Sequence, residues 1–404
     1  GASVTDPARL QNYKFNSNPD AYRDSFPKVA GTAVPSNIVL ADPDFKFPQV
    51  WRTNLALDKR LGNNWTVTLE ALYSNDLNSV SMRNANQRNP DSVFTGVDDR
   101  PRYRNSASRR YYSNVTSAVV LENTDLGNAF QFTAQLTKNF SRGFYGSLAY
   151  TYSFAQEVTA NPGNQASSVW NSNPTVGTQN DLELSYSNYA VPHRIVGNVS
   201  YRLEWLQRFA TTISLFYEGA AQGNYSYVYN GDLNNDGNNT TDLLYIPKDA
   251  SEIIFVNQSA NAQSGLNAYT AEQQREAFFR FVENTPYLRD HKGQYAERNA
   301  AFLPWYNRLD LRVLQDISGT FAGRKHSLQV SLDVTNFANL ISSNWGIRNQ
   351  TIINNPLVPA GVNAAGQPTF RMTQVGGQLP TQPFQRTLGT ASTWGMQLGL
   401  RYIF

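Results

Sequence analysis

Hydrophobic and polar residues alternate with a period of two in segments of roughly ten residues along much of this 404-residue chain. The clearest case is the C-terminal segment STWGMQLGLRYIF. As a strand, it would carry on one face the side chains of Trp394, Met396, Leu398, Leu400, Tyr402 and Phe404. The opposite face would carry Gly395, Gln397, Gly399 and Arg401. Because successive side chains of a β-strand point to opposite faces, this pattern predicts an all-β protein whose strands have one apolar and one polar face.

The same alternation predicts about nine strands. They cover residues 49–61, 64–82, 112–140, 143–157, 191–205, 209–221, 305–317, 325–338 and 391–404. A length of about ten residues suits a tilted strand that crosses a membrane. Alternation alone does not separate a soluble sandwich, in which apolar faces meet in a core, from an outer-membrane barrel, in which they meet lipid.

The connections between the expected strands favour the barrel. Short turns at 62–64, 141–143 and 206–208 alternate with long loops, notably 222–304 and 339–390. Barrels of the bacterial outer membrane have short periplasmic turns and long extracellular loops, whereas loops above about 15 residues are uncommon in compact soluble domains. We therefore expect a transmembrane antiparallel β-barrel in the bacterial outer membrane.

The order of the strands indicates which part of a barrel the chain forms. Single-chain bacterial barrels have an even number of strands, and the expected number here is odd. Residues 1–48 are Pro-rich and loop-like, and we expect them to be an extracellular segment. Residues 49–404 would then be the C-terminal strands of a larger barrel with their large loops.

Composition agrees with this interpretation. Charged residues are 16% of the chain and aromatic residues 13%, against about 25% charged residues in ordinary soluble domains. No apolar run approaches the roughly 20 residues of a membrane helix, and GASVTDPARL is not a signal peptide, so we expect a mature form or a fragment. The chain has no cysteine, and its net charge of +3 comes from scattered basic residues, so a nucleic-acid partner is not expected.

Six stretches resemble, in order and spacing, the C-terminal barrel portion of TonB-dependent outer-membrane transporters, in the Oar-like, SusC-like branch of Bacteroidetes. They are DPDFKFPQVWRTNLALDKRLGNNWTVTLEALYSNDLN, ENTDLGNAFQFTAQLTKNF, GDLNNDGNNTTDLLYIP, RNAAFLPWYNRLDLRVLQD, SLQVSLDVTNFANL and GLRYIF. The resemblance extends over residues 42–404.

This resemblance implies a barrel of about 22 strands, closed by a plug domain that is absent from this sequence. It implies uptake of a glycan, peptide or similar oligomer, driven by the TonB complex through the plug, with outer-membrane lipid around the barrel and a surface lipoprotein (SusD-like or other) as a further partner. It also implies that the C-terminal residues are a signal for the barrel-assembly machinery, namely Trp394, Leu398, Leu400, Tyr402 and Phe404. The alternatives are a passive or structural outer-membrane barrel, such as an adhesin or an envelope scaffold, and a soluble surface β-protein.

The stretch GDLNNDGNNTTDLLYIP has the spacing of a calcium loop. Counted from Asp232, Asn234 and Asp236 occupy positions 3 and 5, Gly237 position 6 and Asn238 position 7, as in an EF-hand. Position 12 is Leu243, where a bidentate acid is required, and Asp242 comes one residue early. The sequence leaves two interpretations open: a Ca²⁺ site formed by Asp232, Asn234, Asp236, Asn238 and Asp242, or a turn built from residues that cap their own backbone.

Further polar and aromatic residues have expected positions. Arg308, Asp310, Arg312 and Asp333 should face the lumen, where pairing with one another and with the plug is favoured over contact with substrate. Thr270 and Gln273 form a capping box before a helical apolar stripe, which we expect to pack on neighbouring loops; it could instead close over the pore or meet a lipoprotein. The expected interfacial aromatic residues are Trp51, Trp65, Trp205 and Tyr402.

Enzyme motifs are nearly absent. Ser25 and Lys28 match the S-x-x-K pattern of penicillin-interacting enzymes, but Pro27 would disrupt the helix and no K-T-G follows. The three histidines lack zinc-ligand spacing. We expect a protein that is not an enzyme.

Overall fold

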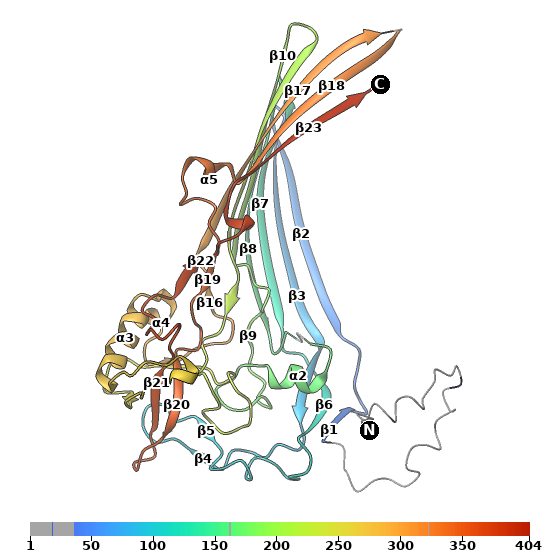
Figure 1. Ribbon diagram of the computed structural model, residues 1–404. Coiled ribbons are helices and arrows are strands. Elements are labelled where there is room, and N and C mark those ends of the chain that lie inside the picture. The colour runs from blue at the N-terminus through green and yellow to red at the C-terminus, as the bar shows by residue number, and fades with distance from the viewer. Residues whose placement is uncertain (1–17, 19–35, 161–162, 322) are drawn as a thin grey trace.

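A long twisted sheet stands on a folded assembly of loops (Figure 1). The computed structural model describes residues 18, 36–160, 163–321 and 323–404. The S-x-x-K pattern at 25–28 and most of the loop-like segment 1–48 lie outside the described residues. Within the described part of the chain, none of the helices is both long enough and apolar enough to cross a membrane.

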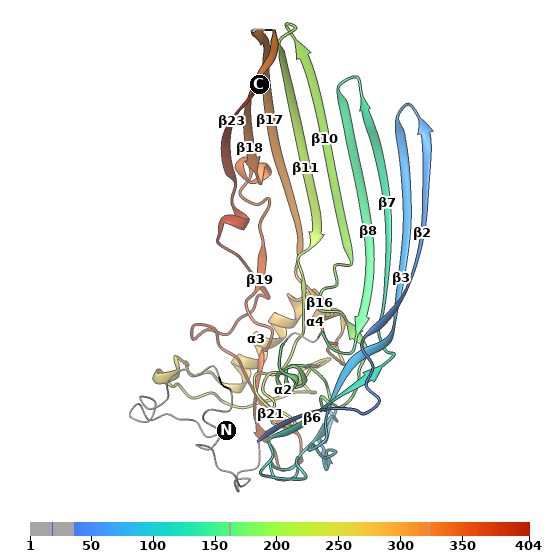
Figure 2. The ribbon, with the colours of Figure 1, turned by 90° about the vertical axis from the view of Figure 1, so that its right-hand side faces the viewer.

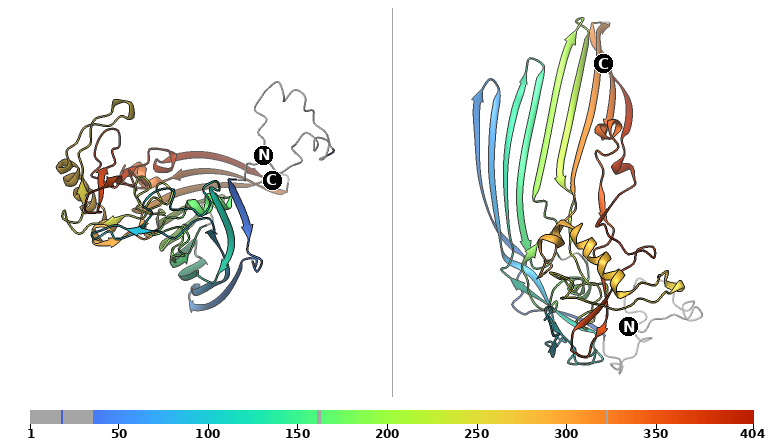
Figure 3. Two further views of the ribbon diagram at one scale, coloured as in Figure 1. Left: turned by 90° about the horizontal axis from the view of Figure 1, so that it is seen from below. Right: turned by 90° about the vertical axis from the view of Figure 1, so that its left-hand side faces the viewer.

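The sheet is built mainly from strands that follow one another along the chain. They are β2 (Gln49–Gly62), β3 (Trp65–Asn84), β7 (Asn128–Ser141), β8 (Phe144–Glu157), β10 (His193–Trp205), β11 (Phe209–Ala221), β17 (Trp305–Phe321), β18 (Arg324–Thr335) and β23 (Gly395–Ile403). Each pairs antiparallel with the next, as an up-and-down meander does (Figure 2). The sheet is curved rather than flat (Figure 3).

One expected strand, 112–140, is wrong. It is divided into β6 (Ser117–Thr124) and β7, because the chain turns at Gly127, which has φ +141°. The backbone of Gly127 lies so close to Asp76 that a Cβ atom would be 2.2 Å from the carboxylate. Consequently β6 pairs with the far end of β3, and β1 (Asn37–Ala41), which lies in the segment expected to be loop-like, pairs parallel with β6. With β9 (Ser185–Tyr186), the described sheet has twelve strands.

Two other strand boundaries, the end of β18 and the start of β23, differ from the prediction for local reasons. β18 ends at Thr335, before the expected residue 338, because Asn336 takes a left-handed conformation with φ 52° and α5 (Phe337–Ile341) begins directly after it. β23 begins at Gly395, after the expected residue 391, because a short 3₁₀-helix, η3 (Thr390–Ser392), precedes it.

Short turns join the strands at one end of the sheet, opposite to the loop assembly (Figure 2). The turn between β2 and β3 has positive φ at Gly62, Asn63 and Asn64, and the turn between β10 and β11 has it at Leu206 and Gln207. Such left-handed pairs match the twist of a hairpin. The predicted separation of short turns at one end from long loops at the other is confirmed.

The long loops contain their own secondary structure and are joined by small sheets. The helices are α2 (Ala166–Asn171), α3 (Ala271–Glu283), α4 (Pro286–Asp290) and the 3₁₀-helix η2 (Ala262–Ser264). The short strands are β4 (Ser92–Val93), β5 (Pro101–Arg102), β12 (Asn224–Tyr225), β13 (Tyr245–Ile246), β14 (Ile254–Phe255), β15 (Gln294–Tyr295), β16 (Ala301–Phe302), β19 (Asn349–Thr351), β20 (Leu357–Val362), β21 (Pro368–Met372) and β22 (Phe384–Arg386). Strand β14 pairs with β21, so the loops 222–304 and 339–390 form one body.

The hydrophobic core lies in this loop assembly. Helix α3 begins with the predicted capping box, in which Gln273 N donates to Thr270 Oγ1 (3.2 Å) and Thr270 N donates to Gln273 Oε1 (2.9 Å). Its apolar stripe is fully buried at Phe278, Phe281 and Val282, where it joins a core cluster of residues from both long loops. The prediction that this helix packs on neighbouring loops is therefore confirmed.

Candidate functional site

The sheet has one apolar and one polar face along its whole width. Residues directly opposite each other on paired strands share a face. One face carries apolar pairs between successive strands, namely Leu57 with Leu69, Leu136 with Leu148, Val199 with Leu215, Leu215 with Leu311, and Leu332 with Leu398. Several of these side chains are highly exposed, including Leu398 at 73%. A contiguous apolar surface of this extent calls for an apolar environment, which lipid supplies.

The other face is polar and is crossed by hydrogen bonds. One cross-strand row runs through Ser200, Ser214, Arg312, Asp333 and Gln397. The Ser214 hydroxyl donates to Ser200 (3.0 Å), and Arg312 Nε forms an ion pair with Asp333 Oδ1 (3.0 Å). Such a face suits water or another protein domain and is unsuited to lipid.

The four charges predicted to face the lumen all lie on this polar face and are paired. Arg308 and Asp310 form an ion pair at 2.8 Å, and Asp310 also accepts from Asn336 N at 2.7 Å. Together with the pair between Arg312 and Asp333, this is the mutual pairing that the sequence predicted.

The sequence-based site did not include a further ion pair on the same face. Arg202 Nη1 donates to Asp316 Oδ2 (2.7 Å), and Asp316 also accepts from Gln329 Nε2 (2.7 Å). These residues line a polar cavity of about 540 Å³ near the short turns. Alternation places each of them on the polar face, but only the register of β10, β11, β17 and β18 brings them together.

Strand β23 and its neighbours hold the predicted C-terminal signal. Leu398, Leu400 and Tyr402 lie on its exposed apolar face, and Trp394 and Phe404 flank the strand. The Tyr402 hydroxyl lies 2.7 Å from His326 Nδ1. Of the predicted interfacial aromatic residues, Trp65 and Trp205 lie beside the short turns, as Tyr402 does, whereas Trp51 lies toward the loop end of β2.

The loop 231–247 folds tightly around its own carboxylates. Asp232 accepts from Asp236 N (3.0 Å) and Gly237 N (2.9 Å), and Asp236 Oδ1 accepts from Asn238 N (2.7 Å). The early acid, Asp242, turns back toward the start of the loop, where its Oδ2 accepts from Leu233 N (2.7 Å). All five predicted ligand residues therefore belong to one compact turn.

Asp236 and Asp242 are buried in this turn, and burial disfavours the charged form of each carboxyl group. Burial raises the pKa of Asp242 to about 8, with Arg100 opposing the shift and Asp236 and Asp232 adding to it. Burial likewise raises the pKa of Asp236 to about 6, and repulsion from Asp232 contributes. Among the described residues, no group of three or more His, Cys, Asp or Glu side chains is placed to hold a metal ion, so a cation here would need amide and backbone oxygens as well.

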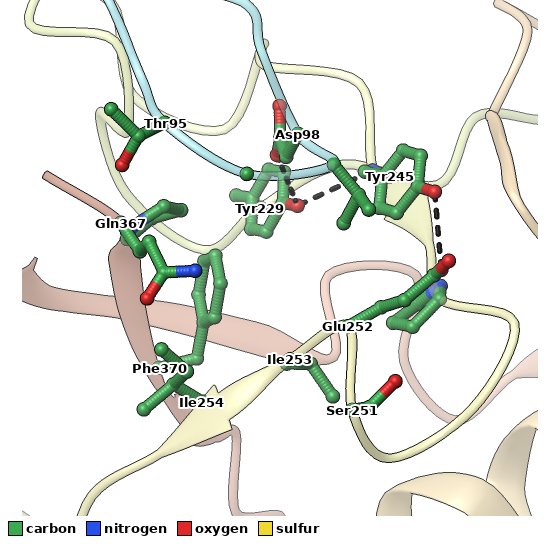
Figure 4. Close-up of a pocket in the computed structure, with 14 residues that line it drawn as sticks. Thr95, Asp98, Tyr229, Tyr245, Ser251, Glu252, Ile253, Ile254, Gln367 and Phe370 are labelled. Carbon is green, nitrogen blue, oxygen red and sulfur yellow. Dashed lines mark hydrogen bonds between the residues drawn. The ribbon is translucent and has the colours of Figure 1, made fainter. Parts of the chain in front are cut away.

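A small pocket of about 100 Å³ lies nearby, between the loop that carries Asp98 and the long loops (Figure 4). The Tyr245 hydroxyl donates to Glu252 (3.1 Å), and the Tyr229 hydroxyl donates to Asp98 (3.1 Å). Asp98 also accepts from Tyr295 Oη (3.0 Å) and Arg100 Nε (2.8 Å). The hydrogen-bonding capacity of the Asp98 carboxylate is thus used within the protein, and the cluster connects the loop that carries Asp98 to the long loop that carries Tyr229 and Tyr295.

The sequence analysis did not identify this cluster. Arg100 has a fully buried side chain and stacks on Tyr229 and Tyr295, with ring-centroid distances of 4.8 and 5.3 Å. Asp98 and Arg100 are two residues apart in sequence, but the tyrosines come from a distant loop. The charged residues Asp98 and Arg100, two positions apart inside a loop, are the only local sequence feature that points to this cluster.

A second, more polar cavity of about 310 Å³ borders the loop 231–247. Its lining includes Asp236, Gly237 and Asn238 together with Arg109 and Gln87. It joins the loops that follow β3, β8 and β11, and its lining side chains are mostly uncharged and polar.

Comparison with known proteins agrees with the two-faced sheet. The family described as "Outer membrane beta barrel domain" matches residues 2–374, and the chain belongs to this family. It is accordingly a protein of the bacterial outer membrane. We found no match among curated proteins.

Among solved structures, the chain is similar to the crystal structure of the outer membrane transporter YddB from Escherichia coli. The TM-score is 0.40 and the sequence identity is 12%. The match covers 92% of this chain and 35% of that one, so the chain spans about a third of the length of the transporter.

Proposed function

We propose that this chain is the C-terminal barrel portion of a TonB-dependent uptake transporter of the SusC-like, Oar-like type, which imports a glycan, peptide or similar oligomer. The observation that carries the proposal is the folded loop assembly. The loops 222–304 and 339–390 share a hydrophobic core and a small sheet, and we propose that they form a layer at the mouth of the barrel. Binding residues commonly lie on loops held by a rigid scaffold. A simple passive pore has no comparable need for such a layer.

The free edges of the sheet support a larger barrel. Among the described pairings, β2 pairs with β3 alone and β23 with β18 alone. Unpaired backbone groups in lipid are costly, so spanning sheets close into barrels. We propose that further strands complete a barrel of about 22 strands with a plugged lumen.

The polar face supports contact with a plug. The ion pairs between Arg202 and Asp316 and between Arg312 and Asp333 lie on this face and are only partly buried. We propose that a plug domain contacts this face and connects it to the TonB complex, and that the outer surface of the loop layer meets a surface lipoprotein. No catalytic step is part of this proposal.

The test uses the full-length gene in its own host. Cells that lack the gene should lose growth on one class of oligomer, and inactivation of TonB in cells that carry the gene should have the same effect. Growth that depends on the gene but persists without TonB would instead favour a passive barrel. An adhesion or envelope defect with unchanged uptake would favour the structural alternative.

A further inference from the structure

Two carboxylate oxygens in the loop 231–247 are buried without a partner. Asp236 and Asp242 are 6% and 1% exposed, and Asp236 Oδ2 and Asp242 Oδ1 accept no hydrogen bond. Buried polar atoms normally have a partner, and a buried charge requires a counter-charge.

The neighbouring arginines are committed elsewhere or form no ion pair with these acids. Arg100 attracts Asp242, and its Nε donates to Asp98 (2.8 Å) and its Nη2 to the Leu243 carbonyl (2.8 Å). Its Nη1 is buried without a partner and forms no hydrogen bond with Asp242. Arg109 lies against Gly237, and the described residues show no ion pair between it and the loop acids. Hydrogen bonding from Gln179 lowers the pKa of Asp236 and so partly offsets its burial, but the Gln179 Nε2 donates to the Thr241 hydroxyl (3.3 Å) and leaves Asp236 Oδ2 without a close partner.

The hydrogen bonds inside the turn leave these two oxygens free. The backbone N–H groups of Leu233 and Asn238 bind the other oxygen of Asp242 and Asp236, respectively. Each carboxylate is therefore fixed through one oxygen, and the second is available. Leu243, at the position where a calcium loop requires an acid, is 2% exposed and packs as an apolar residue.

We propose that the turn 232–242 binds one Ca²⁺ ion, with Asp236 Oδ2 and Asp242 Oδ1 as its charged ligands. The side-chain oxygen of Asn234 and the carbonyl of Asn238 complete the set, with water entering from the polar cavity that Asp236 borders. Asp232 is not among the ligands, because no group of three acidic side chains in the described residues is placed to hold a metal ion. Calcium accepts six to eight oxygens in flexible geometry, including amide and carbonyl oxygens, whereas Mg²⁺ demands a near-ideal octahedron. Asp242 thereby replaces the acid that is missing at Leu243.

The bound ion would stabilise the contacts among three loops, which follow β3, β8 and β11. Tyr103 N donates to the Asn234 carbonyl (2.8 Å), Asn234 Nδ2 donates to the Gly177 carbonyl (2.6 Å), and Asn238 Nδ2 donates to Gln179 Oε1 (2.8 Å). The turn is therefore the meeting point of the loops after β3, β8 and β11. Calcium stabilises this part of the loop layer rather than taking part in a reaction.

The experiment uses the full-length protein purified in detergent and stripped with a chelator. Metal analysis after addition of CaCl₂ and dialysis should find about one equivalent of calcium, and calcium should raise the melting temperature more than MgCl₂ does. Asp242→Asn and Asp236→Asn should each weaken calcium affinity by about tenfold or more, because each removes one of the few charged ligands. Asp249→Asn, which changes an exposed acid of the same long loop, is the matched control and should leave affinity unchanged.

The chelated state separates a metal site from a structural role. Without calcium, Asp242→Asn and Asp236→Asn should melt at or above the temperature of the wild type, because each replaces a buried carboxyl whose charged form is unfavourable with a neutral amide. With calcium they should melt below it. Absence of bound calcium in the wild type would overturn the proposal, and so would an equal destabilisation by both variants with and without the ion.

Discussion

Gly143, in the turn between β7 and β8, illustrates how single residues set the geometry of the sheet. It has φ +82°, and a Cβ there would lie 2.3 Å from the carbonyl oxygen of Arg202 on the neighbouring strand. Gly62 has a similar φ of +87°, but nothing lies within 4 Å of the position of its Cβ. The two glycines therefore separate the effect of backbone conformation from that of close approach.

We predict that Gly143→Ala destabilises the protein more than Gly62→Ala does. In both variants an alanine must adopt a left-handed backbone conformation, which lowers the free energy of unfolding by roughly 1 kcal/mol. Only Gly143→Ala adds a steric clash with Arg202. Urea unfolding in detergent micelles, followed by tryptophan fluorescence, measures the difference. Equal unfolding midpoints for the two variants would show that β10 can shift away from residue 143 with no loss of stability.

At the scale of elements, helix α3 is stabilised at two levels. Its capping box satisfies two backbone donors at the N-terminus, and its apolar stripe supplies part of the core of the loop assembly. Burial outweighs capping in magnitude, because a fully buried Phe contributes several times as much as one capping hydrogen bond.

We predict that Thr270→Ala lowers the stability of the loop assembly by about 1 kcal/mol and Phe281→Ala by about 3–5 kcal/mol. Hydrogen exchange of the α3 amides provides the measurement. Glu276→Ala, at a position whose side chain is not part of the core cluster, is the control and should change protection little. If Phe281→Ala leaves the exchange rates unchanged, the helix does not depend on this core.

At the scale of the whole molecule, the two faces of the sheet experience different solvents. Leu398 and Gln397 are adjacent on β23, but Leu398 faces the apolar side, opposite Leu332, and Gln397 the polar side, opposite Asp333. A charged side chain on the lipid side costs about 2–4 kcal/mol at mid-membrane and little on the lumen side.

We therefore predict that Leu398→Arg reduces the amount of folded protein in the outer membrane, whereas Gln397→Arg has little effect. Heat-modifiable mobility on gels of the outer-membrane fraction measures folded barrel in both variants. The opposite order would mean that the faces are assigned the wrong way round. Equal amounts would mean that β23 does not face lipid.

Much of the sheet could be predicted because alternation is a local property. A strand with two different environments shows them at every second residue, and the short turns contain residues that tolerate positive φ, such as Asn63 and Asn64. The capping box of α3 is local in the same sense. The break at Gly127 was not predicted, because apolar residues continue on both sides of it and the contact that requires glycine comes from Asp76 on another strand.

The sequence by itself determined that this chain forms two-faced strands, short turns at one end and long loops at the other, since each of these depends on neighbouring residues. Only the tertiary structure decided which loops share a core, which charges pair on the polar face, and that Asp98, Arg100 and Tyr229 meet. It also decided that Asp242 turns back toward Leu233, leaving one buried oxygen without a partner. The physical reason is that these contacts join residues far apart in the chain, and their geometry follows from strand register and loop packing, which no local pattern records.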